Sequence, residues 1–105
     1  MIKVYKGTEI KLSVSIDPID NMHMADYDFE VALYVSGGQQ VKKTKQECIK
    51  VDNDTYIVTL DTNALGKTGK LLLKVTADIP DGDFEDKLRT EVSCIDTDVM
   101  VLKEM

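Results

Sequence analysis

The chain has 105 residues, of which 43% are hydrophobic and 30% charged, so it can bury a single core without help from a metal or disulfides. Its formal net charge of -6 argues against a nucleic-acid partner, because neutralising phosphates requires clustered Lys and Arg. No apolar run approaches the length of a membrane span, and no signal-peptide pattern follows Met1. We therefore expect one domain, residues 1–105, that contacts neither nucleic acid nor membrane and stays in the cytosol unless a larger assembly carries it out.

The N-terminal part of the chain predicts two strands and a loop. Residues 8–16 alternate apolar and polar side chains and stop at Asp17-Pro18, which is the pattern of a strand with one buried face. Residues 2–5 form a shorter run of the same kind, and we expect either an edge strand or an arm that pairs with a neighbouring subunit. Residues 19–27 are expected to form a loop that carries His23 between two methionines.

A hairpin is predicted next. Residues 28–36 alternate as a strand, and Gly37-Gly38 can take positive φ and close a tight turn. The returning segment, residues 39–46, is nearly all polar and is expected to be an edge strand, which residues 47–51 could continue. The side chains expected to face inward are Phe29, Val31, Leu33 and Val35, followed by Cys48 or Ile49.

Two further strands are predicted in the middle of the chain. Residues 55–61 alternate, and residues 70–79 have the clearest period-two pattern of all. Between them, residues 62–66 are expected to form one helical turn that is capped by Thr62 and ended by its glycine, with Leu65 packed on the core.

The C-terminal part predicts a loop and a last pair of strands. Residues 80–87 form an acidic loop that begins at a proline, which cannot donate to a sheet ladder. Val92 and Cys94 alternate in the first strand of the pair, residues 96–98 interrupt the pattern, and residues 99–102 close the chain.

This order of elements predicts an all-β fold, specifically an immunoglobulin-like antiparallel β-sandwich of about seven or eight strands. An α/β fold would need helices between the strands, and no segment has a helical period. Cys48 and Cys94 are expected to be reduced and partly buried, because the chain has no Trp and Cys48 lies too late for an immunoglobulin bridge. The basic run Lys42, Lys43 and Lys45 is expected to protect a sheet edge.

The acidic loop is the strongest candidate for a ligand site. Calcium takes six to eight oxygen ligands, and a loop dense in carboxylates can supply them. The spacing does not match an EF-hand, and Lys87 and Arg89 lie close enough to neutralise the acids instead. Both a calcium site and a solvated, ion-paired loop therefore remain open. The weak calcium candidates are Asp78, Asp81, Asp83 and Asp86.

Catalysis is not expected, and no cofactor is predicted. His23 is the only histidine and has no Ser, Cys or second His near it in a catalytic pattern, so we expect a surface-loop residue. Sugar-binding faces usually present aromatic rings, and this chain has four Tyr, two Phe and no Trp. Tyr5, Tyr27 and Tyr34 could form a small exposed patch, although packing in the core or at its rim is favoured.

A set of turn and strand motifs runs along most of the chain. In order they are Lys6-Gly7-Thr8, Asp28-Phe29-Glu30-Val31 with the Gly-Gly hairpin, Asp61, Leu65-Gly66, Gly69-Lys70-Leu71, and Ile79-Pro80-Asp81-Gly82-Asp83-Phe84-Glu85-Asp86 to Arg89. Together they resemble small immunoglobulin-like proteins encoded by phages and prophages of gut Bacteroides-type bacteria. More loosely, they are similar to the immunoglobulin-like N-terminal domain of phage baseplate upper proteins. The resemblance implies a non-enzymatic virion component of a tail, baseplate, head fibre or capsid decoration, present in many copies.

The expected partners are other virion proteins or further copies of the chain, bound by pairing at strand edges and by loop 80–89. The protein would then be made in the bacterial cytoplasm and end in the virion. An alternative is a ligand-binding module that recognises a surface glycan or calcium. The residues expected at the pairing edges are Ile2, Val4, Tyr5, Val99 and Val101.

Overall fold

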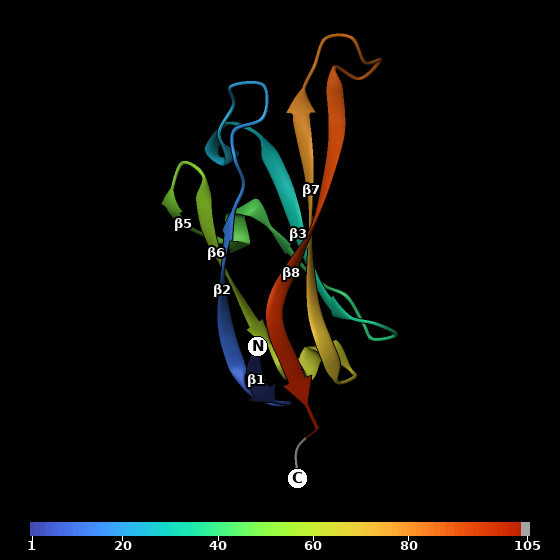
Figure 1. Cartoon of the computed structure of the whole chain (residues 1–105). Coiled ribbons are helices and arrows are strands. Elements are labelled where there is room, and N and C mark those ends of the chain that lie inside the picture. The colour runs from blue at the N-terminus through green and yellow to red at the C-terminus, as the bar shows by residue number, and fades with distance from the viewer. Residues whose placement is uncertain (104–105) are drawn as a thin grey trace.

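The computed structural model describes residues 1–103 and contains eight strands in two sheets (Figure 1). The larger sheet has the order β1-β8-β7-β3-β4, and the smaller one has the order β2-β6-β5. Within residues 1–103 the helical elements are three short 3-10 turns. The elements are β1 (Ile2–Tyr5), β2 (Glu9–Ser15), η1 (Met24–Asp26), β3 (Asp28–Val35), β4 (Val41–Thr44), η2 (Lys45–Glu47), β5 (Ile49–Asp52), β6 (Thr55–Asp61), η3 (Thr62–Leu65), β7 (Gly69–Pro80) and β8 (Leu88–Leu102).

The connectivity is that of an immunoglobulin-like sandwich. β2, β6 and β5 form one sheet, while β3, β7 and β8 form the centre of the other, with β4 added beside β3 as in variable-type domains. The paired strands run antiparallel, except that β1 runs parallel to the end of β8. The predicted all-β sandwich is confirmed.

The core lies between the two sheets and is built by the period-two patterns. Alternate residues of β3 and β7 turn apolar side chains inward, and β2 and β6 meet them from the other sheet with six inward apolar side chains, of which four are fully buried. Each fully buried Leu, Ile or Val contributes roughly 1.5–3 kcal/mol of transfer free energy. The buried side chains of these strands that join the core are Val14, Phe29, Val31, Leu33, Val35, Tyr56, Val58, Leu60, Leu71, Leu73, Val75, Ala77 and Ile79.

The end of the chain differs from the prediction, because residues 88–102 form one strand rather than two. The register against β7 shifts between Lys70 and Leu72, so the expected interruption is a bulge. The Thr97 hydroxyl donates a 2.7 Å hydrogen bond to the Leu71 carbonyl, and Asp98 takes a positive φ of 58°. The hydrogen bond of Thr97 and the left-handed backbone of Asp98 therefore accommodate the extra residues of β8 without ending the strand.

The segment after β4 also differs from the prediction. Residues 49–52 do not continue β4 but cross to the smaller sheet, where they pair with β6. η2 makes the crossing, and its capping box has Glu47 accepting hydrogen bonds from the Thr44 amide and hydroxyl. Cys48 is half-buried, whereas Ile49 is exposed, so of the two expected inward residues only Cys48 packs on the core.

The predicted turn at residues 62–66 forms as η3, with one change in its cap. The Asp61 carboxylate, not Thr62, accepts the hydrogen bond from the Asn63 amide, at 3.0 Å. Thr62 is completely buried, and its hydroxyl accepts from the Gly7 amide and donates to the Thr8 carbonyl, both at 2.8 Å. Leu65 is buried and Gly66 ends the turn with a φ of 75°, as expected.

Candidate functional site

The acidic loop closes the hairpin between β7 and β8, and the carboxylate of Asp81 in this loop forms an ion pair. Asp81 accepts a 2.7 Å hydrogen bond from Nη1 of Arg89, which lies on β8. Nη2 of the same guanidinium bonds Asp20 at 2.7 Å, and its Nε bonds Glu91 at 3.1 Å. The hydrogen bond to Asp20, together with the bond to Asp81, raises the pKa of Arg89. Arg89 thus ties the hairpin to the loop that precedes η1.

The other calcium candidates do not converge on one point. The Asp83 amide donates to Asp81, and the Asp86 carboxylate accepts from the Leu88 amide, so both residues shape the turn. Asp78 lies on β7 between Asp28 and Thr90 of the neighbouring strands. Among residues 1–103 no group of three or more His, Cys, Asp or Glu side chains is placed to hold a metal ion. This geometry matches an ion-paired loop.

His23 holds two loops together. Its Nδ1–H donates to the Asp54 carboxylate, with the oxygens at 2.8 and 2.9 Å, because a carboxylate can only accept. Asp54 belongs to the turn between β5 and β6, and the Ala25 amide also bonds the Asn53 carbonyl of that turn, at 3.0 Å. The half-buried imidazole therefore has a structural role, since it joins the η1 loop to this turn.

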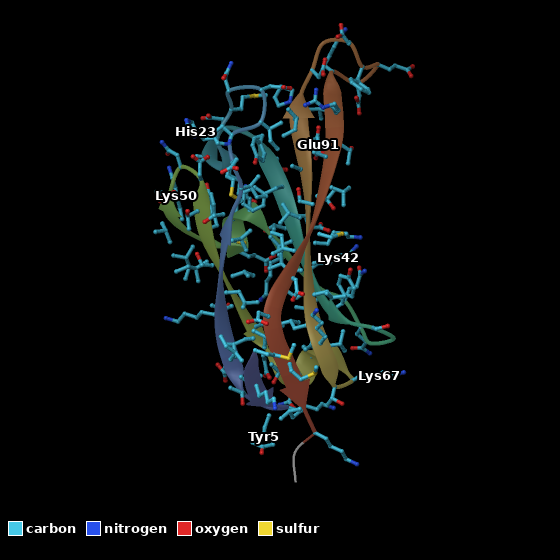
Figure 2. All side chains as sticks on the ribbon, in the orientation of Figure 1. Tyr5, His23, Lys42, Lys50, Lys67 and Glu91 are labelled. Carbon is cyan, nitrogen blue, oxygen red and sulfur yellow. The ribbon has the colours of Figure 1, made fainter. Side chains whose placement is uncertain are left out.

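The three tyrosines do not form a patch. Tyr27 is buried in the core, where its ring centroid lies 6.4 Å from that of Phe29 in an edge-on arrangement. Tyr34 is half-buried, and Tyr5 is exposed at the opposite end of the molecule from His23 (Figure 2). The cysteines are both free thiols; Cys48 is half-buried, whereas Cys94 is exposed on β8. Burial raises the pKa of the Cys48 thiol.

The main unpaired feature of the sandwich is one edge of β8. β8 has 15 residues, and β1 pairs with only the last four of them, so the remaining eleven, residues 88–98, have no strand on that side among the described residues. Figure 1 shows β8 running the length of the molecule, with β1 beside its lower end only. We refer to residues 88–98 as the open edge.

The direction of the open main-chain groups follows from one hydrogen bond. The Asp81 amide donates to the Lys87 carbonyl at 2.9 Å, so the main-chain groups of these two residues face each other across the β7–β8 hairpin. Bonded pairs recur at every second residue of an antiparallel ladder. Arg89, Glu91 and Ser93 therefore bond β7, while the amides and carbonyls of Thr90, Val92 and Cys94 face the open side.

Exposed apolar side chains accompany the open edge. Val92 is 55% exposed, Leu88 is 41% exposed, and Phe84 at the hairpin tip is 45% exposed. A shallow hollow at this tip is lined by Phe84, Glu85, Asp86, Leu88, Arg89 and Thr90. Thr90 and Val92 do not stand out in the sequence as contact residues, because the interruption at residues 96–98 predicts two short strands where the structure has one of 15 residues.

The predicted pairing edges are corrected in one respect. Val99 and Val101 are buried in the core, and the edge of residues 99–102 is occupied by β1 in register Ile2↔Val99. The two runs expected to reach outward therefore pair with each other. Residues 2–5 are an edge strand, with Ile2 and Tyr5 exposed and Val4 half-buried. The outer side of β1 is unpaired among the described residues, but it offers only four residues.

A second opening lies between the edges of β2 and β8. It has a volume of about 320 Å³ and is lined by Leu12, Ser13, Val14, Ser15, Leu73, Ile95, Asp96 and Thr97. This is at the lower limit of the roughly 300–1,000 Å³ of ligand pockets, so we assign no ligand to it.

Neither a protein-family model nor a curated protein matches this chain. In the part of the chain that the structure describes, no helix has the length and apolar character needed to cross a membrane.

Proposed function

We propose that this protein is a non-enzymatic interaction module that binds other polypeptides by accepting a strand at the open edge of β8. The observation that carries the proposal is the eleven-residue stretch of β8 that no strand covers among residues 1–103. A partner strand laid along it would satisfy the outward main-chain groups, and alternate side chains would give specificity.

The composition of this edge supports binding rather than protection. Proteins usually protect exposed sheet edges with lysine, proline or bulges. β4, at the other edge of the same sheet, carries Lys42 and Lys43. Residues 88–98 contain no Lys or Pro, the charges of Arg89 and Glu91 pair with each other, and the bulge comes only at the far end, near Asp96. One edge of the sheet, β4, therefore carries residues that protect it from pairing, whereas the open edge of β8 does not.

We propose a virion as the setting of these contacts, as a component of a tail, baseplate, head fibre or capsid decoration. The support for this is the sequence resemblance, which covers motifs from Lys6 to Arg89. A β-sandwich fits such a role, because assembly needs a stable scaffold with accessible edges. No feature of the structure favours the calcium or glycan alternative, since Asp81 is bound to Arg89 and the tyrosines lie apart.

The test is site-specific photo-crosslinking in particles released from a host that carries the gene. A photoreactive residue at Thr90 should crosslink to another virion polypeptide or to a second copy, identified by mass spectrometry. The matched control is the same residue at Lys50, which is exposed on the smaller sheet and should give no crosslink (Figure 2). Particles that lack the chain, or crosslinks equally frequent at both positions, would contradict the proposal.

A further inference from the structure

The open edge begins with a segment that is complementary to itself. Its sequence is Leu88-Arg89-Thr90-Glu91-Val92. When two copies of this segment are aligned in opposite directions, apolar residues face apolar residues, threonine faces threonine, and each basic residue faces an acidic one. We propose that a second copy of the chain occupies this edge, with β8 pairing antiparallel to β8 of the other copy about a two-fold axis at Thr90. This inference rests on the proposed function, because it names the strand that the open edge accepts.

The hydrogen-bonding phase permits this pairing. The main-chain groups of Leu88, Thr90 and Val92 face the open side, as the bond between Asp81 and Lys87 requires. An axis at Thr90 sets each Thr90 opposite the partner's Thr90 as a bonded pair. It also sets Val92 opposite Leu88 of the partner subunit, again as a bonded pair, on both sides of the axis.

The charges select this register. With the axis at Thr90, Arg89 lies opposite the partner's Glu91, and this occurs twice. Directly opposite residues of a non-bonded pair have the shortest side-chain separation, where opposite charges stabilise and like charges destabilise. An axis at Arg89 would set Arg against Arg, and one at Glu91 would set Glu against Glu. An axis at Val92 would set Arg89 against Ile95, which offers no charge.

The apolar pairs gain most from the contact. Val92 and Leu88 are 55% and 41% exposed in the isolated chain, and in the dimer each covers the other. Glu91, which already accepts from Arg89 of its own strand at 3.1 Å, has a second oxygen for the partner's guanidinium. A two-fold contact also closes on itself, so it gives a dimer rather than a filament. Edge pairing over so few residues buries less than a standard interface of about 1,600 Å², so the dimer should form reversibly.

Disulfide trapping tests the register. In a background with both native cysteines changed to serine, Thr90→Cys should form an intermolecular disulfide, because bonded pairs lie about 5.5 Å apart between Cα atoms. Val92→Cys is the matched control on the same face. With the axis at Thr90, the two copies of position 92 are four residues apart along the strands, about 13 Å, which is too far for a disulfide.

A charge exchange provides an independent measurement. Glu91→Arg and Arg89→Glu should each weaken self-association, measured by analytical ultracentrifugation, by about tenfold, because each sets like charges opposite one another. Mixed together, the two variants should form a heterodimer, since every facing pair is again of opposite sign. Circular dichroism of each variant shows that it is folded; if Arg89→Glu is not, the Thr90→Cys result decides alone.

The outcomes separate this inference from the proposed function. A disulfide at position 92 instead of 90 overturns the register with the axis at Thr90. No disulfide at either position and a monomer at every concentration overturn the homodimer. In that case a crosslink from Thr90 to a different virion protein would leave the proposed function standing. Absence of any crosslink from Thr90 would remove both.

Discussion

The two halves of β8 have the same alternating pattern but opposite environments. In the lower half, β8 runs between β1 and β7, and Val99 and Val101 are 4% and 1% exposed. In the upper half one edge is open. There Arg89, Glu91 and Ser93 take the inward positions and are half-buried, whereas Val92 turns to the outer face of the sheet and is 55% exposed. Alternation decides which face of a sheet a side chain joins, but the neighbouring strands and the opposite sheet decide whether that face is covered.

Different interactions also hold the two halves in place. The lower half is fixed by strand pairing with β1 and by the buried Thr62 hydroxyl, which joins the turn between β1 and β2 to η3. The upper half is fixed by charges, since Arg89 bonds Asp20, Asp81 and Glu91. Apolar contacts should therefore carry the stability of the lower half, and the upper half should be easier to open.

The largest expected difference is between two valines. Val101→Ala should lower the free energy of unfolding by about 2 kcal/mol, because it removes buried methyl groups and leaves a cavity. Val92→Ala should change it by less than about 0.5 kcal/mol, since the side chain is exposed. Urea denaturation below the concentration of self-association measures both. Equal losses would show that the Val92 side chain on the outer face is as well covered as Val101 in the core.

Thr62→Val should have the next largest effect. The substitution keeps the shape of the side chain but leaves the Gly7 amide without its 2.8 Å acceptor, and an unsatisfied buried donor costs about 1–2 kcal/mol. Thr55→Val is the matched control, because the Thr55 hydroxyl bonds Ser15 at an exposed position. We expect the control to stay within about 0.5 kcal/mol in the same denaturation experiment. A silent Thr62→Val would mean that the turn after β1 does not depend on this hydroxyl.

The faces of the strands were predictable from the sequence, and their neighbours were not. Phe29, Val31 and Leu33 were assigned to the core correctly because period-two alternation is a local property of a strand. Ile49 was left open as an inward residue, but it is exposed, because residues 49–52 lie at the edge of the smaller sheet. Which sheet a short edge strand joins depends on contacts with distant residues, and no local pattern encodes them.

The candidate site was only partly predictable. The acidic loop and the proximity of Arg89 to it were visible in the sequence, and Arg89 does pair with Asp81. Its bond to Asp20, 69 residues away, was not visible, because it depends on the sandwich bringing two loops together. The open edge was missed for the same reason. Its existence follows from β1 ending after four residues, whereas β8 has 15.

Arg89→Met should open the upper half with a moderate effect. It removes three charge-assisted hydrogen bonds and leaves three carboxylates close together, so we expect a loss of stability in dilute solution that is smaller than that of Thr62→Val. Amide hydrogen exchange should accelerate in residues 17–22 and 81–89 and stay unchanged in β1. Lys50→Met is the control, because no ion pair is assigned to Lys50 within the described residues. Faster exchange in β1 would indicate that the two halves unfold together.

The smallest expected effect is a pH dependence at the bulge between the two halves. The Lys70 ammonium lies 2.6 Å from Asp96, and this hydrogen bond lowers the pKa of Asp96, assisted by the amide of Asp98. The same carboxylate raises the pKa of Lys70. Because the pKa of Asp96 is lower in the folded state, its contribution to stability is fully present at neutral pH. That contribution is lost as the pH falls from the ordinary value of 3.8 through the lower, folded value.

Lys70→Met should therefore move the titration midpoint of Asp96 upward toward its ordinary value, as followed by NMR of the carboxyl carbon. Lys67→Met makes the same charge change on a neighbouring exposed lysine and should leave the midpoint in place (Figure 2). At neutral pH neither variant should lose measurable stability, because both partners of the pair are largely solvated and exposed ion pairs contribute little. An Asp96 midpoint that does not respond to Lys70→Met would show that the Asp98 amide, and not Lys70, sets the pKa of Asp96.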